Sequence, residues 1–180
     1  MSTRETLLAL VSDCGATDAK PIVQDGIVYD LSFAEACRVN TCGNYGRCHM
    51  CPPDVGEPEK LMERARTYPN GILYESVYPL EDAFDYEGMM DARKRHSNLT
   101  RRIQERLSSA PGDFLHLGVG GCGICETCAK VEDAPCRFPE KALASLESYC
   151  VFVSETARNA GLPYRNGQNS ITYFGLILYR

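Results

Sequence analysis

The distribution of cysteines limits what this chain can fold into more than any other feature. The 180 residues include ten cysteines, and eight of them form two groups of four. The first group is Cys37, Cys42, Cys48 and Cys51, and the second is Cys122, Cys125, Cys128 and Cys136. Because packing alone does not cluster cysteines at fixed spacing, the groups indicate disulfides, a metal or redox chemistry.

The start of the chain argues against disulfides, which need an oxidising compartment. Residues 1–5 contain no positive charge followed by an apolar run, so they do not predict a signal peptide. No apolar run approaches the roughly 18 residues of a membrane span. We therefore expect a soluble, cytoplasmic protein without a membrane partner, in which clustered cysteines indicate metal or redox chemistry.

The formal charge of −5 argues against general nucleic-acid binding, which requires a basic surface. One basic run departs from this balance, and we interpret it as a solvated helix face. A docking patch for an acidic partner is the alternative. The run comprises Arg93, Lys94, Arg95, His96, Arg101 and Arg102.

Periodicity and breakers predict one α+β domain over residues 1–180, with a mixed sheet of about four strands and helices packed on it. A hydrophobic content of 44% suffices for one core. Ser32 with Glu35 predicts a capping box at the start of a helix that carries Cys37. The other expected helices are 4–13, 57–67, 87–108, 139–147 and 154–160, and the strands are 27–29, 71–78, 114–117 and 171–179. Two metal-binding loops, about 37–53 and 118–139, lie between these elements.

The spacing of the second cysteine group indicates a metal cluster more specifically than that of the first. Cys122, Cys125 and Cys128 form a C-x2-C-x2-C run, which in bacterial ferredoxins wraps around one cubic cluster. Cys136 follows after seven intervening residues and has room to return to the same cluster. Glycines at 118, 120, 121 and 123 allow backbone N–H groups to approach the cluster sulfur atoms. The spacing predicts a [4Fe–4S] cluster, with structural zinc as the alternative.

The first group places four cysteines within fifteen residues, followed by Pro52 and Pro53. Four cysteines match one four-coordinate site, but the spacing distinguishes less clearly between a cluster and zinc. His49 lies inside the group and is an alternative ligand. We predict a second cluster here, bound by Cys37, Cys42, Cys48 and Cys51.

The remaining candidates have simpler interpretations. We expect Cys14 and Cys150 to be ordinary, partly buried thiols. His116 is predicted to be a core residue, or one that tunes a nearby cluster. The polar residues 166–169 predict a turn, with hydrogen bonding to a cluster or small ligand as the alternative. No motif of a hydrolase or a dinucleotide-binding enzyme is present.

The chain resembles a family of cysteine-rich proteins known as predicted metal-binding proteins, a domain of unknown function frequent in anaerobic prokaryotes. The resemblance rests on residues 42–46 (CGNYG) leading into 51–53 (CPP), 78–82 (YPLED) followed by 85–90 (DYEGMM), 122–128 with 136–142 (CRFPEKA), and 172–175 (TYFG). It implies metal binding in a cytoplasmic, oxygen-avoiding setting and brings no established reaction. In the family pattern, Cys37, Cys42 and Cys51 join the second group. If Cys48 lies outside that pattern, the first site has three thiolates and an open position or a non-cysteine ligand.

Three functional hypotheses follow. The first is an electron-transfer or accessory protein that holds one or two [4Fe–4S] clusters and exchanges electrons with a redox partner protein. The second is an iron–sulfur enzyme, or a subunit of one, with a substrate-accessible cluster. The third is an interaction module stabilised by zinc.

Overall fold

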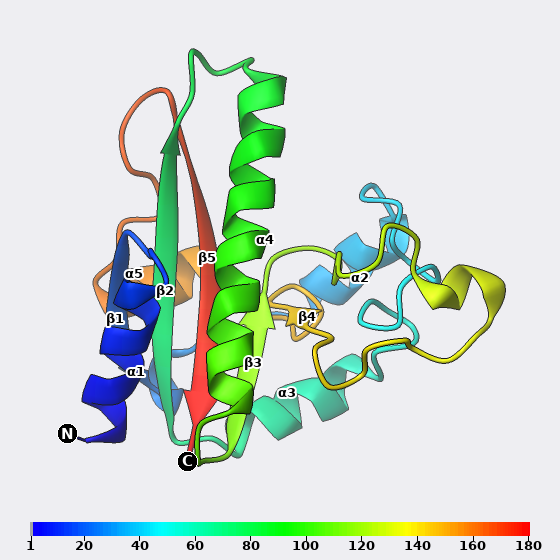
Figure 1. Cartoon of the computed structure of the whole chain (residues 1–180), viewed down its shortest axis with the longest axis horizontal. Helices are drawn as coiled ribbons and strands as arrows, with labels where there is room; N and C mark the ends of the chain where they lie inside the picture. Colours follow the sequence, from blue (N-terminus) through cyan, green and yellow to red (C-terminus); the bar gives the residue numbers. More distant parts are fainter. Residues whose placement is uncertain (1) are drawn as a thin grey trace.

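The computed structural model describes residues 2–180 and consists of a five-stranded mixed sheet with five α-helices, which confirms the predicted α+β class (Figure 1). Short 3-10 turns, η1 (Gln24–Gly26) and η2 (Ala129–Glu132), interrupt the connections. The helices are α1 (Thr3–Asp13), α2 (Ser32–Val39), α3 (Pro58–Arg66), α4 (Tyr86–Ser108) and α5 (Val153–Ala160). The strands are β1 (Asp18–Val23), β2 (Asn70–Pro79), β3 (Phe114–Gly118), β4 (Ala144–Ser145) and β5 (Ser170–Tyr179).

The two long strands β2 and β5 form the centre of the sheet, whose order is β1-β2-β5-β3-β4. They pair antiparallel, with Leu73 opposite Leu176 and Ile72 opposite Ile177. Both strands are rich in apolar and aromatic residues because they are buried on both faces. At one edge, β4 runs parallel to β3.

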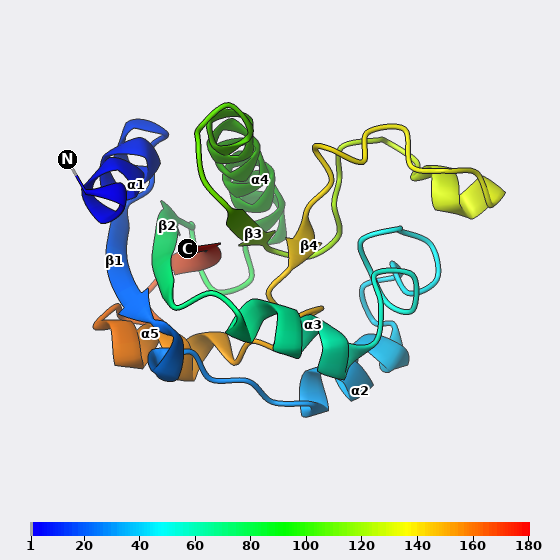
Figure 2. The same cartoon turned by 90° about the horizontal axis from the view of Figure 1, so that it is seen from below.

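Helices cover both faces of the sheet (Figure 2). Helices α1 and α4 pack on one face, over a core that includes Leu7, Leu99 and Ile103. Helices α3 and α5 pack on the other face, where Leu61 and Ala157 join a second core. Alternate residues of β2 and β5 point into the two cores, as the period of two in a strand requires.

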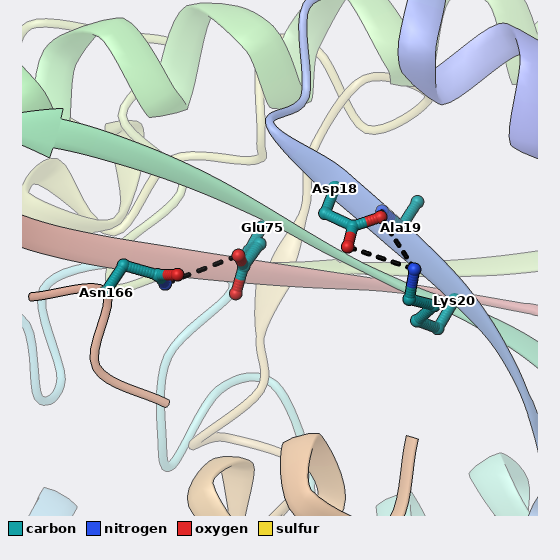
Figure 3. A network of polar contacts seen from close by, with 5 residues as sticks. All are labelled: Asp18, Ala19, Lys20, Glu75 and Asn166. Atoms are coloured by element: carbon teal, nitrogen blue, oxygen red, sulfur yellow. Dashed lines mark hydrogen bonds and ion pairs between the residues drawn. The ribbon is translucent and has the colours of Figure 1, made fainter. Parts of the chain in front are cut away.

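A polar network lies within the sheet at the pairing of β1 with β2 (Figure 3). Asp18 and Glu75 are register partners, and Lys20 Nζ donates to Asp18 Oδ1 at 3.1 Å. Glu75 is only 2% exposed; Asn166 Nδ2 donates to its Oε1 at 3.3 Å, and its Oε2 has no hydrogen-bond partner. Residues 168–169 form a turn before β5, as predicted, and Ser170 Oγ donates to Asn166 O across it at 3.0 Å.

Three local predictions were wrong. The expected helix over 139–147 is a series of turns around β4, because its backbone pairs with β3 instead, as in the bond from Leu146 N to Gly118 O. The expected strand 27–29 is reduced to one bridge between Tyr29 and Val151. Ser32 is the first residue of α2 and makes no cap; Ser2 and Glu5 form a capping box, at α1.

Among the helices of the described residues, none is both long enough and apolar enough to cross a membrane.

Candidate metal centre

Both cysteine groups lie beyond the β4 edge of the sheet, on segments that the two views place side by side (Figures 1 and 2). The first segment runs from α2 to α3, and the second joins β3 to β4. Several contacts join them. His49 Nε2 donates to Ala134 O at 2.8 Å, and Lys130 Nζ forms an ion pair with Asp54 Oδ1 at 2.8 Å. Gly121 also lies against the side chain of Asn44, since a Cβ atom on this glycine would come within 3.0 Å of Asn44 Nδ2. The hydrogen bond of His49 and the ion pair of Lys130 therefore help to hold the segments together.

Local backbone chemistry shapes the first segment. Helix α2 carries Cys37 and ends at Asn40, whose left-handed backbone (φ 58°) reverses the chain. Asn40 Oδ1 accepts a hydrogen bond from Tyr45 N at 3.0 Å, and Gly46 N donates to Pro52 O at 2.9 Å. These bonds fold the segment back on itself, so that Cys51 returns toward Cys37.

A cavity of about 430 Å³ lies at the first group, and it is lined mainly by apolar atoms. Three of the four predicted ligands line it, namely Cys37, Cys42 and Cys51. Cys48 does not. The charged side chains of Arg93 and Glu147 reach the same cavity from α4 and from the turn after β4.

A second, smaller cavity of about 30 Å³ brings together the complete second group. Cys48 joins it from the first segment, so five cysteines surround this space: Cys48, Cys122, Cys125, Cys128 and Cys136. The four cysteines of the second group thus line one cavity together with Cys48, whose position could not be predicted from the spacing of the cysteines.

Cys48 also links the two groups electrostatically. A hydrogen bond with Cys51 lowers the pKa of the Cys48 thiol, as do the backbone N–H groups of Cys122 and Met50. The same bond to Cys48, followed by burial, raises the pKa of Cys51. A thiolate at Cys48 is therefore stabilised between the two cavities.

Two other thiols have a pKa that is raised mainly by burial. It raises the pKa of Cys37, and the negative charge of Glu147 adds to the effect. Burial also raises the pKa of Cys122, although the backbone N–H groups of Leu143 and Ile124 point at its sulfur and oppose the shift. Metal binding would have to displace these protons, because the thiolate is the ligand.

Two arginines of α4 contact the glycine-rich start of the second segment. Arg101 Nη2 donates to Gly123 O, and a Cβ atom on Gly120 would meet Arg93 Nη2 at 3.0 Å. Both glycines have a positive φ angle, which residues with a side chain rarely adopt.

The basic run of α4 was predicted to be a solvated helix face. This prediction is correct for Lys94, Arg95 and Arg102, which are exposed. It is wrong for His96, which α4 buries against the sheet, whereas Arg93 and Arg101 are half-buried.

Glu147 is a potential site residue that no sequence pattern indicated. Its Oε2 atom is buried and has no hydrogen-bond partner. No pattern singles it out, since it lies in a segment that was expected to be an ordinary helix. Within residues 2–180, no three His, Cys, Asp or Glu side chains are placed to chelate one metal ion as they stand. The thiols instead line the two cavities.

Comparison with known proteins identifies one family. Residues 20–179 match the family described as "Predicted metal-binding protein (DUF2284)". No curated protein and no solved structure matches the chain. The matched range contains both cysteine segments and four of the five strands completely, and it includes most of β1.

Proposed function

Because the chain belongs to this family of predicted metal-binding proteins, we propose that it is an iron–sulfur protein, which binds two [4Fe–4S] clusters and transfers electrons to or from a partner enzyme. One cluster would be held by Cys122, Cys125, Cys128 and Cys136, and the other at the cavity of Cys37, Cys42 and Cys51. Bound there, a cluster supplies reversible one-electron exchange.

The observation that carries the proposal is the convergence of the second group on one cavity. Thiolates are the ligands of iron–sulfur clusters, and a C-x2-C-x2-C run supplies three of them from a single tight loop. The backbone N–H groups of Leu143 and Ile124, which point at the Cys122 sulfur, are of the kind that stabilises cluster sulfur. The donor set thus fits a cluster.

The charges around the cysteines support a redox role. Arg93 and Arg101 lie against the glycines of the second segment, and a positive charge favours the more negative, reduced form of a cluster. Cys48 and Cys51 are in contact, so the two thiol groups adjoin. Adjacent clusters would allow electrons to pass through the protein to the partner.

The test is the metal content of protein purified without oxygen, with visible and electron-paramagnetic-resonance spectra before and after dithionite. We expect about eight iron and eight sulfide per chain, and a brown colour that reduction bleaches. Cys14→Ala is the control, since Cys14 lies outside both cavities. Zinc in place of iron, or protein without iron and sulfide, would contradict the proposal; zinc would support the interaction module instead.

A substrate-accessible cluster is a second candidate function, and the first cavity favours it. At about 430 Å³ its size matches that of small-molecule sites. Its apolar wall and the guanidinium of Arg93 would suit a small carboxylate, provided that bound metal neutralises the carboxylate of Glu147 in the same cavity. A paramagnetic spectrum of the reduced protein that changes on addition of malonate would support this candidate. The same spectrum with and without malonate favours a plain electron carrier.

A further inference from the structure

One carboxylate oxygen beside the first cavity has no partner within the described chain. Glu147 follows β4, and its Oε2 is buried without a hydrogen bond. Glu147 as a whole is half-buried, but this one oxygen has lost its hydration without gaining a donor, which is unfavourable. The Oε2 atom of Glu147 is therefore available to a positively charged partner that the described side chains do not supply as they stand.

The first cavity supplies a reason for this carboxylate. Glu147 lines it together with Cys37, Cys42 and Cys51, whereas the fourth cysteine of that segment, Cys48, lines the other cavity. Three thiols and one orphaned carboxylate oxygen make four donors, which is the number that a cubane cluster or a tetrahedral zinc ion requires.

We propose that Glu147 is the fourth ligand of the first metal centre, with Cys37, Cys42 and Cys51 as the other three. The assignment rests on the proposed function, because it requires a metal at that site. A carboxylate is a harder and weaker ligand than a thiolate for the iron of a cluster. An iron held by Glu147 would therefore be the most exchangeable one of that cluster, and Arg93 lines the same cavity as Glu147.

The competing explanation is an ion pair. Arg93 and Glu147 line the same cavity, and a small rearrangement in solution would let the guanidinium neutralise the carboxylate. In that case Glu147 stabilises the fold and leaves the metal unaffected. The two explanations predict different effects on the metal itself, which can be measured without any assay of activity.

The test compares the metal-loaded wild type with Glu147→Gln, Glu147→Cys and the control Glu63→Gln, which changes an exposed residue of α3. Mössbauer spectra of iron-enriched protein distinguish iron bound by oxygen from iron bound by sulfur alone. We expect one oxygen-bound iron in the wild type. Glu147→Gln should lose about one iron per chain and give the signal of a three-iron cluster. Glu147→Cys should keep all iron but show only sulfur ligands.

Circular dichroism and thermal unfolding show whether Glu147→Gln folds. If Glu147→Gln does not fold, the iron content and spectrum of Glu147→Cys still distinguish a metal ligand from an ion pair. Full iron with only sulfur ligands in the wild type would overturn the assignment and leave the proposed function intact. So would an unchanged spectrum in Glu147→Gln. If zinc replaces iron, the proposed function fails; X-ray absorption, which averages over both centres, should then show about one oxygen ligand for every two zinc ions if Glu147 is a ligand, and sulfur ligands alone would exclude it. Protein without metal overturns both.

Discussion

At the scale of single residues, identical cysteines have different environments. Cys48 and Cys51 are buried, whereas Cys42 is exposed. Cys14 and Cys150, which were expected to be partly buried, are almost completely buried, and they line neither of the two cavities. Sequence spacing treats the eight grouped cysteines alike, but the position of each sulfur decides which cavity it can line.

Cys48→Ala and Cys42→Ala form a matched pair that tests this difference. If Glu147 completes the first site, Cys48 is a neighbour of both centres and a ligand of neither. Cys48→Ala should then keep about eight iron, with a shifted reduction potential, because one thiolate charge is removed. Cys42→Ala should lose about four iron. Iron analysis and a redox titration are the measurements, and a loss of iron in Cys48→Ala would make that cysteine a ligand.

Glu75 should make the stability of the fold depend on pH. Burial raises the pKa of this carboxyl above 4.5, and the charge of Asp18 adds to the effect, whereas Asn166 and Lys20 oppose it. In the unfolded chain the carboxyl ionises near pH 4.5, while in the fold it keeps its proton to higher pH. The folded state is therefore destabilised as the pH rises through this window.

Glu75→Gln removes that ionisation. Relative to the wild type, its free energy of unfolding should increase between pH 4 and pH 7, and urea unfolding at both values measures the change. Glu63→Gln serves as the exposed control. A difference between variant and wild type that is equal at both pH values would show that Glu75 does not titrate in this range.

At the scale of elements, α4 is held on the sheet by buried polar side chains as well as by its apolar stripe. Tyr74 Oη and His116 Nε2 are 2.8 Å apart, and His116 Nδ1 donates to Gln104 Oε1 at 3.0 Å. Tyr74 Oη also donates to Thr100 Oγ1 of α4 at 3.3 Å. Burial lowers the pKa of His96 to about 4 and that of His116 to about 3, so both rings are neutral at pH 7. His116 is a core residue, as predicted.

Tyr74→Phe should destabilise the fold by about 1–3 kcal/mol, because it removes the hydroxyl that is the hydrogen-bond partner of both Thr100 Oγ1 and the buried Nε2 of His116. Chemical unfolding of the metal-loaded protein measures the loss. Tyr164→Phe is the matched control: this ring is 50% exposed, and its variant should lie within about 0.5 kcal/mol of the wild type. Equal effects in the two variants would contradict the role of this network.

At the scale of the whole molecule, the sheet and the cysteine segments depend on different interactions. Both hydrophobic cores consist mainly of strand and helix residues, and the loop between β3 and β4 contributes almost nothing to them. The residues of that loop are mostly exposed or half-buried. We therefore expect metal to order the cysteine segments, while the sheet is stable through its own apolar burial.

Metal removal by a chelator under anaerobic conditions should separate these two parts. Amide hydrogen exchange should accelerate in residues 37–53 and 119–143, because bound metal then no longer cross-links these segments. Exchange in β2 and β5 should remain slow, which provides an internal control. Uniform acceleration over the whole chain would show instead that the sheet also needs the metal in order to fold.

Local patterns were sufficient for much of the fold. Amphipathic period predicted α1, α3, α4 and α5, and apolar runs predicted β2, β3 and β5. They failed at β1, a six-residue edge strand that contains Pro21, and at the two-residue β4. Neither strand shows an alternation of apolar and polar residues in the sequence, because each forms through its pairing with a neighbouring strand.

The candidate site also has some features that the sequence predicted and others that only the tertiary structure shows. The spacing of residues 122–128 determined that these thiols converge, because a tight loop imposes this over a few residues. The sequence alone also determined the α+β class and the family. Only the tertiary structure turned Cys48 toward the second group and placed Glu147 and Arg93 at the first. These neighbours come from segments far apart in the chain, and their proximity depends on how α4 and the turn after β4 pack beside the sheet.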